Sequence, residues 1–293
     1  MEASDPTLRE YSLDPVHPGM HARPHPFLYL SGILRNNASF YGCGDLIPMT
    51  VNQYMLDKIA KGTMHAALID PDKQPVEKAG ELAKIMKEAG TDIIFVGGSS
   101  GITMENLSAT SKAVKEASGL PVILFGGTPD SLNKELDAVF FMQIVNAADP
   151  RFVTFGQVAA APIIAKLGLE SISMGYVIVE PGMTVARVSS AKVVGQDEIE
   201  KAVAYAMACK MFGFKYIYFE AGSGADRPVP PAMIKAIKTY VDLPLIIGGG
   251  IRTPEAAAAA REAGADIIVT GTLLEQGADD SKLKAVVSAA KGI

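Results

Sequence analysis

The sequence predicts an α/β fold, namely a closed (β/α)8 TIM barrel with a shortened or missing third helix. Two observations support this prediction. From Met64 onward, short apolar runs alternate with longer amphipathic segments, and eight of the short runs have the composition of strands. Strands that alternate with helical crossovers form a parallel sheet, and eight of them close that sheet into a barrel.

The predicted strands are rich in β-branched and aromatic residues and are bounded by turn residues. They cover residues 64–69, 92–96, 121–125, 138–142, 171–179, 216–220, 244–247 and 266–270. The segments AGTDIIFVGG (residues 89–98) and AGADIIVTGT (residues 263–272) resemble each other. This recurrence around the second and eighth strands is compatible with a repeated βα unit.

The predicted helices follow most of these strands, and several begin at Pro or Asp and end before Gly. They cover residues 76–88, 104–117, 152–167, 197–211, 231–239, 254–263 and 282–290. The third crossover differs, because GGTPDSLNKELD, which lies between Phe125 and Ala138, is too short for two loops and a helix. We expect a loop or a single turn there.

The chain is predicted to consist of a poorly ordered N-terminal extension, residues 1–48, and a barrel domain, residues 49–293. The extension contains Pro, His, Asn and Gly without a helical or strand period, apart from the short apolar run FLYLSGIL. We assign it no function.

Composition excludes several classes of protein. The formal net charge of −5 is spread without a long basic run, which disfavours nucleic-acid binding. Cys43 and Cys209 are isolated, so neither a disulfide framework nor a zinc site is indicated. No apolar run has the length of a transmembrane helix, and we expect a cytoplasmic protein.

Three glycine-containing clusters follow the last three predicted strands, at residues 220–224, 248–250 and 271–272. In such barrels, functional groups lie at the carboxyl ends of the strands. Glycines let backbone N–H groups approach an anion, and a helix that begins near Pro254 adds its positive end. A single cluster is more often a tight turn, but three neighbouring clusters favour a phosphate site.

Asp70 and Ser99 follow the adjacent first and second strands, where their oxygen atoms are in a position to share a hard cation such as Mg²⁺. The plainer interpretation makes Asp70 a turn opener before Pro71 and Asp72 the cap of the next helix. Ser99 taken alone is more often a turn residue.

Glu220 is a carboxylate at the mouth of the predicted barrel, directly after an aromatic strand. It must be partly desolvated there and needs a partner, and the plainer alternative is an ion pair with an inward Lys or Arg. His65 lies within the first strand and is interpreted as a structural histidine rather than a catalytic one.

The sequence resembles the geranylgeranylglyceryl phosphate synthases and their bacterial heptaprenyl relatives over residues 49–293. The resemblance rests on HAALIDPDKQ from His65, GGSSG from Gly97, YFEAGSGA from Tyr218, IIGGGIRTPEAA from Ile246 and VTGTLLE from Val269. The DPDK and EAGSG motifs are similar to the second, larger group of this family. A missing third helix is also what the resemblance implies.

The resemblance implies a site and a cofactor. Asp70 and Ser99 would hold Mg²⁺. The glycerol-phosphate site would comprise Tyr218, Phe219, Glu220, Ala221, Gly222, Ser223, Gly224, Gly249, Gly250, Gly271 and Thr272.

The implied reaction joins sn-glycerol 1-phosphate to geranylgeranyl diphosphate or a similar polyprenyl diphosphate, with Glu220 as the catalytic base. The product is an ether-linked prenylglyceryl phosphate of ether phospholipid biosynthesis. The prenyl tail needs an apolar groove, expected beside the third unit and the loop after the fifth strand, residues 176–183. We expect at most transient membrane contact, and apolar outer helices such as AVAYAMACKM indicate a homo-oligomer.

Two alternatives stay open at this stage. One is another phosphate-binding barrel, an isomerase or synthase, which needs a second acid or base but no diphosphate-binding metal. The other is a non-catalytic barrel that binds a phosphometabolite. The chain lacks a DDxxD motif, which argues against the helical prenyl-chain elongases.

Overall fold

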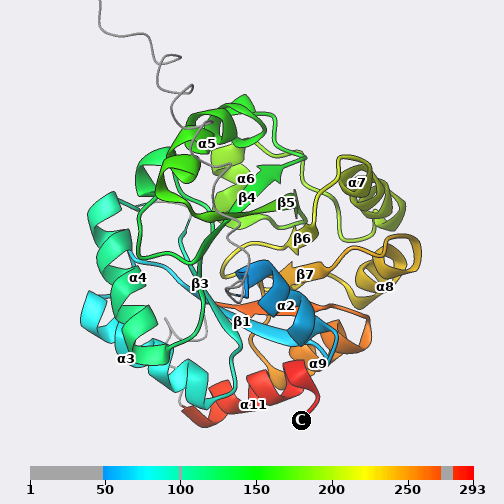
Figure 1. Ribbon diagram of the computed structural model, residues 1–293. Coiled ribbons are helices and arrows are strands. Elements are labelled where there is room, and N and C mark those ends of the chain that lie inside the picture. The colour runs from blue at the N-terminus through cyan, green and yellow to red at the C-terminus, as the bar shows by residue number, and fades with distance from the viewer. Residues whose placement is uncertain (1–48, 99–100, 272–279) are drawn as a thin grey trace, which may run out of the picture. The chain divides into compact units, whose positions relative to one another are not determined.

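The computed structural model describes residues 49–98, 101–271 and 280–293. Its strands form one closed barrel in the order β1 to β8, and each neighbouring pair is parallel. Figure 1 shows the helices arranged around this barrel. The predicted fold class is therefore confirmed, whereas the extension predicted for residues 1–48 lies outside the described residues.

The strands lie where the apolar runs predict them. They are β1 Met64–Ile69, β2 Ile93–Val96, β3 Val122–Leu124, β4 Ala138–Ile144, β5 Glu170–Ile178, β6 Tyr216–Glu220, β7 Leu245–Gly248 and β8 Ile267–Thr270. The bounds of β1 and β6 are as predicted. Strand β4 is two residues longer than predicted, because its pairing with β5 continues to Ile144 and Tyr176.

The helices that cover the barrel are also close to their predicted ranges. They are α3 Val76–Glu88, α4 Met104–Ser118, α5 Phe155–Leu167, α7 Ile199–Met211, α8 Pro231–Tyr240, α9 Pro254–Glu262 and α11 Asp280–Lys291. Between β3 and β4 the chain forms only the 3-10 turn Pro129–Ser131. The expected shortening of the third unit is therefore confirmed.

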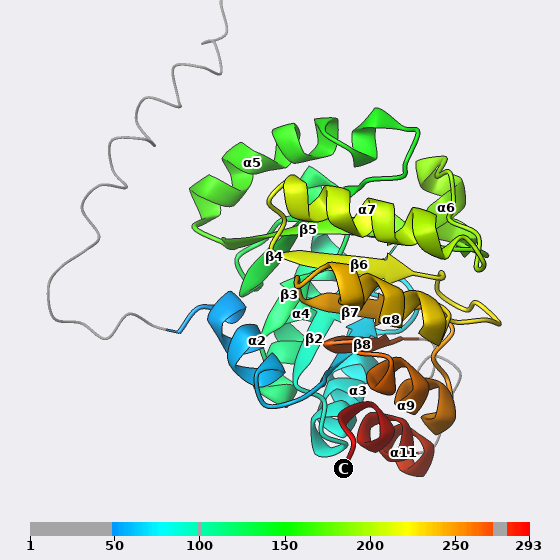
Figure 2. The ribbon, with the colours of Figure 1, turned by 90° about the vertical axis from the view of Figure 1, so that its right-hand side faces the viewer.

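The sequence prediction missed two helices, α2 (Val51–Ile59) and α6 (Met183–Ser189). Figure 2 shows them at opposite ends of the barrel. The first turn of α2 donates its amides at Val51 and Asn52 to the Glu170 carboxylate, at 2.6 and 3.0 Å. These contacts are non-local, so no local period in the sequence predicts them.

Alternation along the strands decides which side chains enter the barrel. Tyr216 and Tyr218 belong to the interior cluster, whereas Ile217 and Phe219 pack between the sheet and the helices. Glu220 therefore shares the inner face of β6. The same alternation in β1 places Asp70 on the face of Ala66, at the carboxyl end of the barrel.

Three similar sets of polar contacts lie at the amino-terminal end of the barrel. In each case an Asp just before a strand accepts a hydrogen bond from a backbone amide at the start of the preceding strand and pairs with a Lys ammonium. The three sets are Asp92 with His65 and Lys291, Asp137 with Val122 and Lys115, and Asp266 with Leu245 and Lys238. The similarity between residues 89–98 and 263–272 therefore has a structural counterpart.

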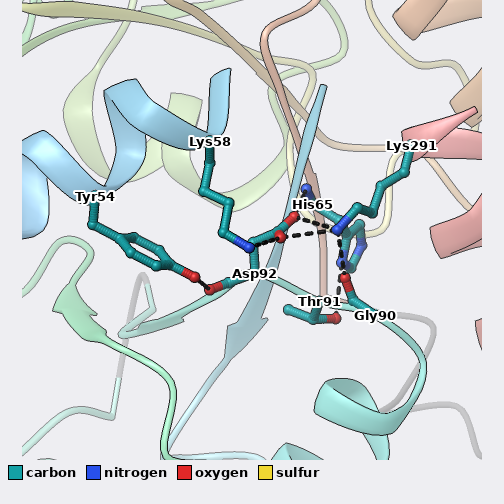
Figure 3. Close-up of polar contacts among 7 residues, drawn as sticks. All are labelled: Tyr54, Lys58, His65, Gly90, Thr91, Asp92 and Lys291. Atoms are coloured by element: carbon teal, nitrogen blue, oxygen red, sulfur yellow. Dashed lines mark hydrogen bonds and ion pairs between the residues drawn. The ribbon is translucent and has the colours of Figure 1, made fainter. Parts of the chain in front are cut away.

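Asp92 is the most connected of these carboxylates (Figure 3). Its side chain is 4% exposed and lies 3.0 Å from Lys58 Nζ of α2 and 2.8 Å from Lys291 Nζ of α11. Its carbonyl accepts a hydrogen bond of 2.7 Å from the Tyr54 hydroxyl. Burial raises the pKa of Asp92, but the hydrogen bonds from Lys291, the His65 amide and Lys58 outweigh it and hold the pKa below its usual value.

We expect Asp92→Asn to lower the free energy of unfolding by about 2 kcal/mol at pH 7, because the partly buried charge-assisted contacts with Lys58 and Lys291 are weakened. A depressed pKa stabilises the fold above the unfolded-state value and loses that effect as the pH falls through the folded-state value. The difference between the two proteins should therefore shrink below about pH 4.

Urea unfolding at pH 7 and pH 3 measures this effect. Asp57→Asn removes the same charge from the exposed side of α2 and should change stability by less than about 0.5 kcal/mol. A constant difference between wild type and Asp92→Asn at both pH values would contradict the assigned pKa direction.

His65 is a fully buried structural residue, as predicted. Its Nδ1 lies 2.9 Å from Thr91 Oγ1, and its Nε2 lies 2.9 Å from Thr270 Oγ1. Burial lowers the pKa of His65 to about 4, so the ring is neutral at pH 7. The ring faces away from the barrel interior, on the outer side of β1 and β8, and takes no part in the site described next.

Candidate functional site

A cavity of about 770 Å³ is lined at one end by polar residues from the loops after several strands. Those residues are Asp70, Lys73, Gly98, Tyr218, Glu220, Ser223, Gly249, Gly250, Arg252 and Gly271. The carboxyl ends of β1, β2, β6, β7 and β8 therefore meet at one cavity, as expected for a parallel barrel.

Glu220 is 6% exposed at the inner end of β6. Its Oε1 accepts a hydrogen bond of 2.7 Å from the Gly222 amide, and its carboxylate also accepts one from the Tyr218 hydroxyl. Burial raises the pKa of Glu220 to about 7 despite both hydrogen bonds. In the part of the chain that the structure describes, no Lys or Arg pairs with Glu220, so the ion-pair interpretation of this residue is wrong.

Gly248, the last residue of β7, and Gly249, which follows it, lie too close to neighbouring atoms to carry a side chain. A Cβ at Gly248 would lie 2.9 Å from Glu220 Oε2 and would overlap the Tyr218 hydroxyl. A Cβ at Gly249 would overlap Glu220 Oε1, and the φ of 80° at Gly249 is itself one that residues with a side chain rarely adopt. These two glycines therefore allow the buried carboxylate and hydroxyl to sit beside the backbone of β7.

The loops after β6 and β7 form one continuous wall. The Ala221 amide donates to the Gly248 carbonyl at 3.1 Å, and a Cβ at Gly250 would meet the backbone nitrogen of Pro228 at 2.9 Å. Gly249, Gly250 and Gly271 all line the cavity together with Ser223. Helix α9 begins at Pro254, four residues after Gly250 in the chain. This wall has the glycine turns and the helix start that an anion site requires.

The predicted glycerol-phosphate residues do not all face the cavity. Phe219 and Ala221 belong to the core between sheet and helices, and the Gly222 amide is committed to Glu220. Tyr218, Glu220, Ser223, Gly249, Gly250 and Gly271 line the cavity. Thr272, like Ser99 of the predicted metal site, lies outside the described residues.

Asp70 directly follows β1, and its carboxylate packs against the backbone of Gly98, where a Cβ would overlap it. Asp70 Oδ1 accepts a hydrogen bond of 3.1 Å from the Asp72 amide. Burial raises the pKa of Asp70, and the Asp72 amide and Lys73 lower it less. Asp72 does not cap α3, because the N-cap is Pro75 and lacks a side-chain hydrogen bond.

The surroundings of Asp70 fit a magnesium ion that takes only part of its ligands from the protein. Within residues 49–98, 101–271 and 280–293, no group of three or more His, Cys, Asp or Glu residues surrounds a metal position. Mg²⁺ commonly uses one or two carboxylates and takes its remaining ligands from water and substrate phosphates. A single hard carboxylate that faces a cavity large enough for a phosphorylated ligand meets that requirement.

Sequence reasoning did not single out Arg252 as a residue of the site. The Arg252 Nη2 donates to the Gly224 carbonyl at 3.1 Å and also to the Ala225 carbonyl. Arg252 lines the cavity, and its guanidinium joins the loop after β7 to the loop after β6. The signal was present as Ile251-Arg252 directly after three glycines, a place where a side chain reaches the neighbouring loop.

The part of the cavity lining that comes from the third unit, α5 and α6 is mostly apolar. It includes Leu124, Phe125, Leu132, Val139, Phe140, Phe141, Ile144, Phe152, Phe155, Ile164, Val185 and Val188, among others. The third unit and Tyr176 contribute to this lining as predicted, and α5 and α6 contribute in addition. In the described part of the chain, no helix has both the length and the apolar character needed to cross a bilayer.

This barrel, with its acidic groups and glycine turns at the carboxyl ends of the strands, defines a phosphate-binding (β/α)8 enzyme. The family model described as the PcrB family matches residues 57–290. The chain belongs to this family.

Relatives support the same assignment. The chain is 46% identical over 234 residues to a geranylgeranylglyceryl phosphate synthase of Thermococcus kodakarensis, covering 80% of this chain and 93% of that protein. It is 44% identical over 235 residues to one of Methanosphaera stadtmanae, covering 80% and 96%. The resemblance seen in the sequence motifs is thus confirmed.

A solved structure is similar as well. The (S)-3-O-geranylgeranylglyceryl phosphate synthase of Thermoplasma acidophilum, in complex with its substrate sn-glycerol-1-phosphate, superposes with a TM-score of 0.81 at 40% identity. The match covers 84% of this chain and 100% of that one. Thiamine phosphate pyrophosphorylase of Pyrococcus furiosus, at 13% identity and a TM-score of 0.52, shares the fold alone.

Proposed function

We propose that this protein is a prenyltransferase of the geranylgeranylglyceryl phosphate synthase type. It joins sn-glycerol 1-phosphate to geranylgeranyl diphosphate or a similar polyprenyl diphosphate and releases diphosphate. The ether-linked prenylglyceryl phosphate that results is a precursor of ether phospholipids. The family membership and the relatives that bear this name support the proposal.

One observation of the structure supports this reaction above the alternatives. The same cavity is lined by Glu220 and the glycine turns and, in addition, by many apolar residues of the third unit, α5 and α6. A phosphosugar isomerase has no use for a long apolar extension next to its phosphate site. A prenyl diphosphate needs one, because its tail must leave water.

We assign the chemistry to residues of the polar end. The glycine turns hold the phosphate of glycerol phosphate, which places the far hydroxyl near Glu220. A carboxyl group with a pKa of about 7 is well matched to accept a proton from that hydroxyl near neutral pH. The Tyr218 hydroxyl and the Gly222 amide hold this carboxylate in place.

We propose that magnesium is held by Asp70, at the opposite side of the cavity's polar end. When bound, magnesium would offset the charge that develops on the departing diphosphate. Asp70 itself would supply one hard oxygen ligand, and its burial on the inner face of β1 keeps that oxygen directed toward the substrate.

Incubating the purified full chain with geranylgeranyl diphosphate and either enantiomer of glycerol phosphate tests the function. Mass spectrometry should detect the prenylglyceryl phosphate with sn-glycerol 1-phosphate and magnesium. The yield should be much lower with the sn-3 enantiomer or with excess chelator. Absence of product with every polyprenyl diphosphate tried would refute the function, and full activity in the chelator would refute the metal.

Arg252→Met is expected to raise the KM for sn-glycerol 1-phosphate about tenfold or more with little change in kcat. The guanidinium holds the Gly224 and Ala225 carbonyls, so its loss loosens the phosphate wall without touching the reacting hydroxyl. Steady-state kinetics measures both constants. Arg252→Lys keeps a cation but not the planar donor set, so its KM should lie between those of wild type and Arg252→Met. A fall in kcat alone would contradict this positioning role.

A further inference from the structure

Met183, the first residue of α6, has a backbone conformation that residues with a side chain seldom adopt. Its φ is 47°, in the left-handed region. In the described part of the chain, the other non-glycine residue with a positive φ is Ser190, which follows the end of α6, where this conformation is common. Met183 begins a helix, so that explanation does not apply to it. Such a conformation in a residue beside a site indicates a functional constraint.

The side chain of Met183 packs on Gly222, in the loop after β6. A Cβ at Gly222 would lie 2.6 Å from Met183 Cγ and 2.8 Å from the carbonyl carbon of Gly182. The Gly182 amide donates to the Ala221 carbonyl at 2.9 Å. The loop after β5 therefore follows the backbone of the loop after β6 and brings Met183 against Gly222.

Gly222 is confined on a second side as well. A Cβ at Gly249 would lie 2.6 Å from the Gly222 nitrogen, so the backbone after β7 passes close to that nitrogen. Between these two neighbours, the Gly222 amide donates to Glu220 Oε1 at 2.7 Å. The direction of this hydrogen bond therefore depends on Met183 as well as on Gly249.

Met183 does not line the cavity, unlike Thr184, Val185 and Val188 of the same helix. It is 43% exposed, so it gains only part of the free energy that burial gives to a methionine. Its contact with the loop that holds the Glu220 carboxylate gives its side chain a second role.

We propose that Met183 is a positioning residue for the proton acceptor of the reaction. By packing on Gly222, its side chain keeps the Gly222 amide directed at the Glu220 carboxylate. Met183 acts through the backbone of the loop after β6, because it lies outside the cavity that would hold both substrates. This inference rests on the proposed function and extends it to a residue of α6.

Met183→Gly removes the side chain and suits the positive φ, so it should fold about as stably as wild type. Without the contact, the Gly222 amide should exchange its hydrogen about 3- to 10-fold faster, because its hydrogen bond opens more often. The kcat should fall by a similar factor of about 3–10, whereas the KM for sn-glycerol 1-phosphate should stay within about twofold of wild type. Met183→Leu keeps an apolar side chain of similar size and should restore both values.

The pH profile of kcat separates positioning from a general loss of structure. A hydrogen bond to the ionised carboxylate lowers its pKa, so a weaker bond from Gly222 should move the rising limb to higher pH by about half a unit. Among described residues, the titratable groups that interact with Glu220 are the hydroxyls of Tyr218 and Tyr176, and β7 faces it with glycines. Burial holds the pKa of both hydroxyls well above its usual value, so they stay neutral across the profile.

Hydrogen exchange of the full chain, followed by mass spectrometry on peptides that contain Gly222, measures the first effect without substrate. Steady-state kinetics on both sides of the Glu220 pKa measures the others. Met207→Ala is the matched control, because Met207 lies on α7, is 39% exposed and does not line the cavity. It should leave exchange at Gly222 and the kinetics within about twofold of wild type. Met183→Ala, which ends at Cβ, should show the effects of Met183→Gly to a smaller extent and serves as the second variant.

Unchanged exchange at Gly222 in both Met183→Gly and Met183→Ala would overturn the proposal, and so would an equal loss of kcat in Met183→Leu. Failure of the proposed function has a different sign, namely that wild type forms no prenylglyceryl phosphate. The exchange measurement needs no turnover, so it still decides in that case whether Met183 holds the Gly222 amide.

Discussion

Glu220→Gln is expected to lower kcat by about 10²–10⁴-fold, the range typical of a lost general base. Glutamine keeps the size of the side chain and can still hydrogen-bond to the Tyr218 hydroxyl, but it cannot accept a proton. The KM for sn-glycerol 1-phosphate should change much less, because the glycine turns hold the phosphate. Single-turnover measurement at saturating substrate isolates this chemical step.

The pH dependence of the same variant gives an independent check. The Glu220 carboxyl group, whose pKa is about 7, accepts a proton only in its ionised form. The wild-type rate should therefore rise with pH through about 7 and level off above it, and the rate of Glu220→Gln should not follow this rise.

Glu81→Gln changes an exposed carboxylate on α3 in the same way and should leave the kinetics unaltered. Near-normal turnover of Glu220→Gln would show that Glu220 positions the substrate without accepting its proton.

Asp70→Asn is expected to lower magnesium-dependent turnover by about 10²–10³-fold. The amide keeps the hydrogen bond from the Asp72 amide but removes the negative charge that is proposed to hold the metal. Binding of sn-glycerol 1-phosphate without metal should stay within about twofold of wild type, because it depends on the loops after β6, β7 and β8. Turnover across a magnesium titration and calorimetry of glycerol phosphate provide the two readouts.

Asp72→Asn is the comparison for this variant. Asp72 lies in the same turn, but it is exposed and does not line the cavity. Its loss should therefore reduce turnover less than the loss of Asp70. An equal or larger loss of turnover in Asp72→Asn would contradict the assignment of the metal to Asp70 and would favour Asp72.

The local pattern of the sequence was sufficient to predict the barrel and the end of the barrel at which the site lies. Strands β1 and β6 have their predicted bounds because each is a buried apolar run between turn residues. Parallel strands have their carboxyl ends at one end of the barrel, so Asp70 and Glu220 had to face the same region. The short third crossover was predictable from its length alone, since a helix needs more residues than it offers.

Long-range contacts decided what the sequence could not. Helix α2 depends on Glu170 and Asp92, which lie far from it in the chain, and Arg252 acts on carbonyls of a different loop. The pKa of Glu220 follows from its burial between Tyr218 and the backbone of β7. Desolvation depends on the atoms that surround a group, and these come from separate βα units. The tertiary structure therefore determined the chemistry of the carboxylate, whereas the sequence determined its location.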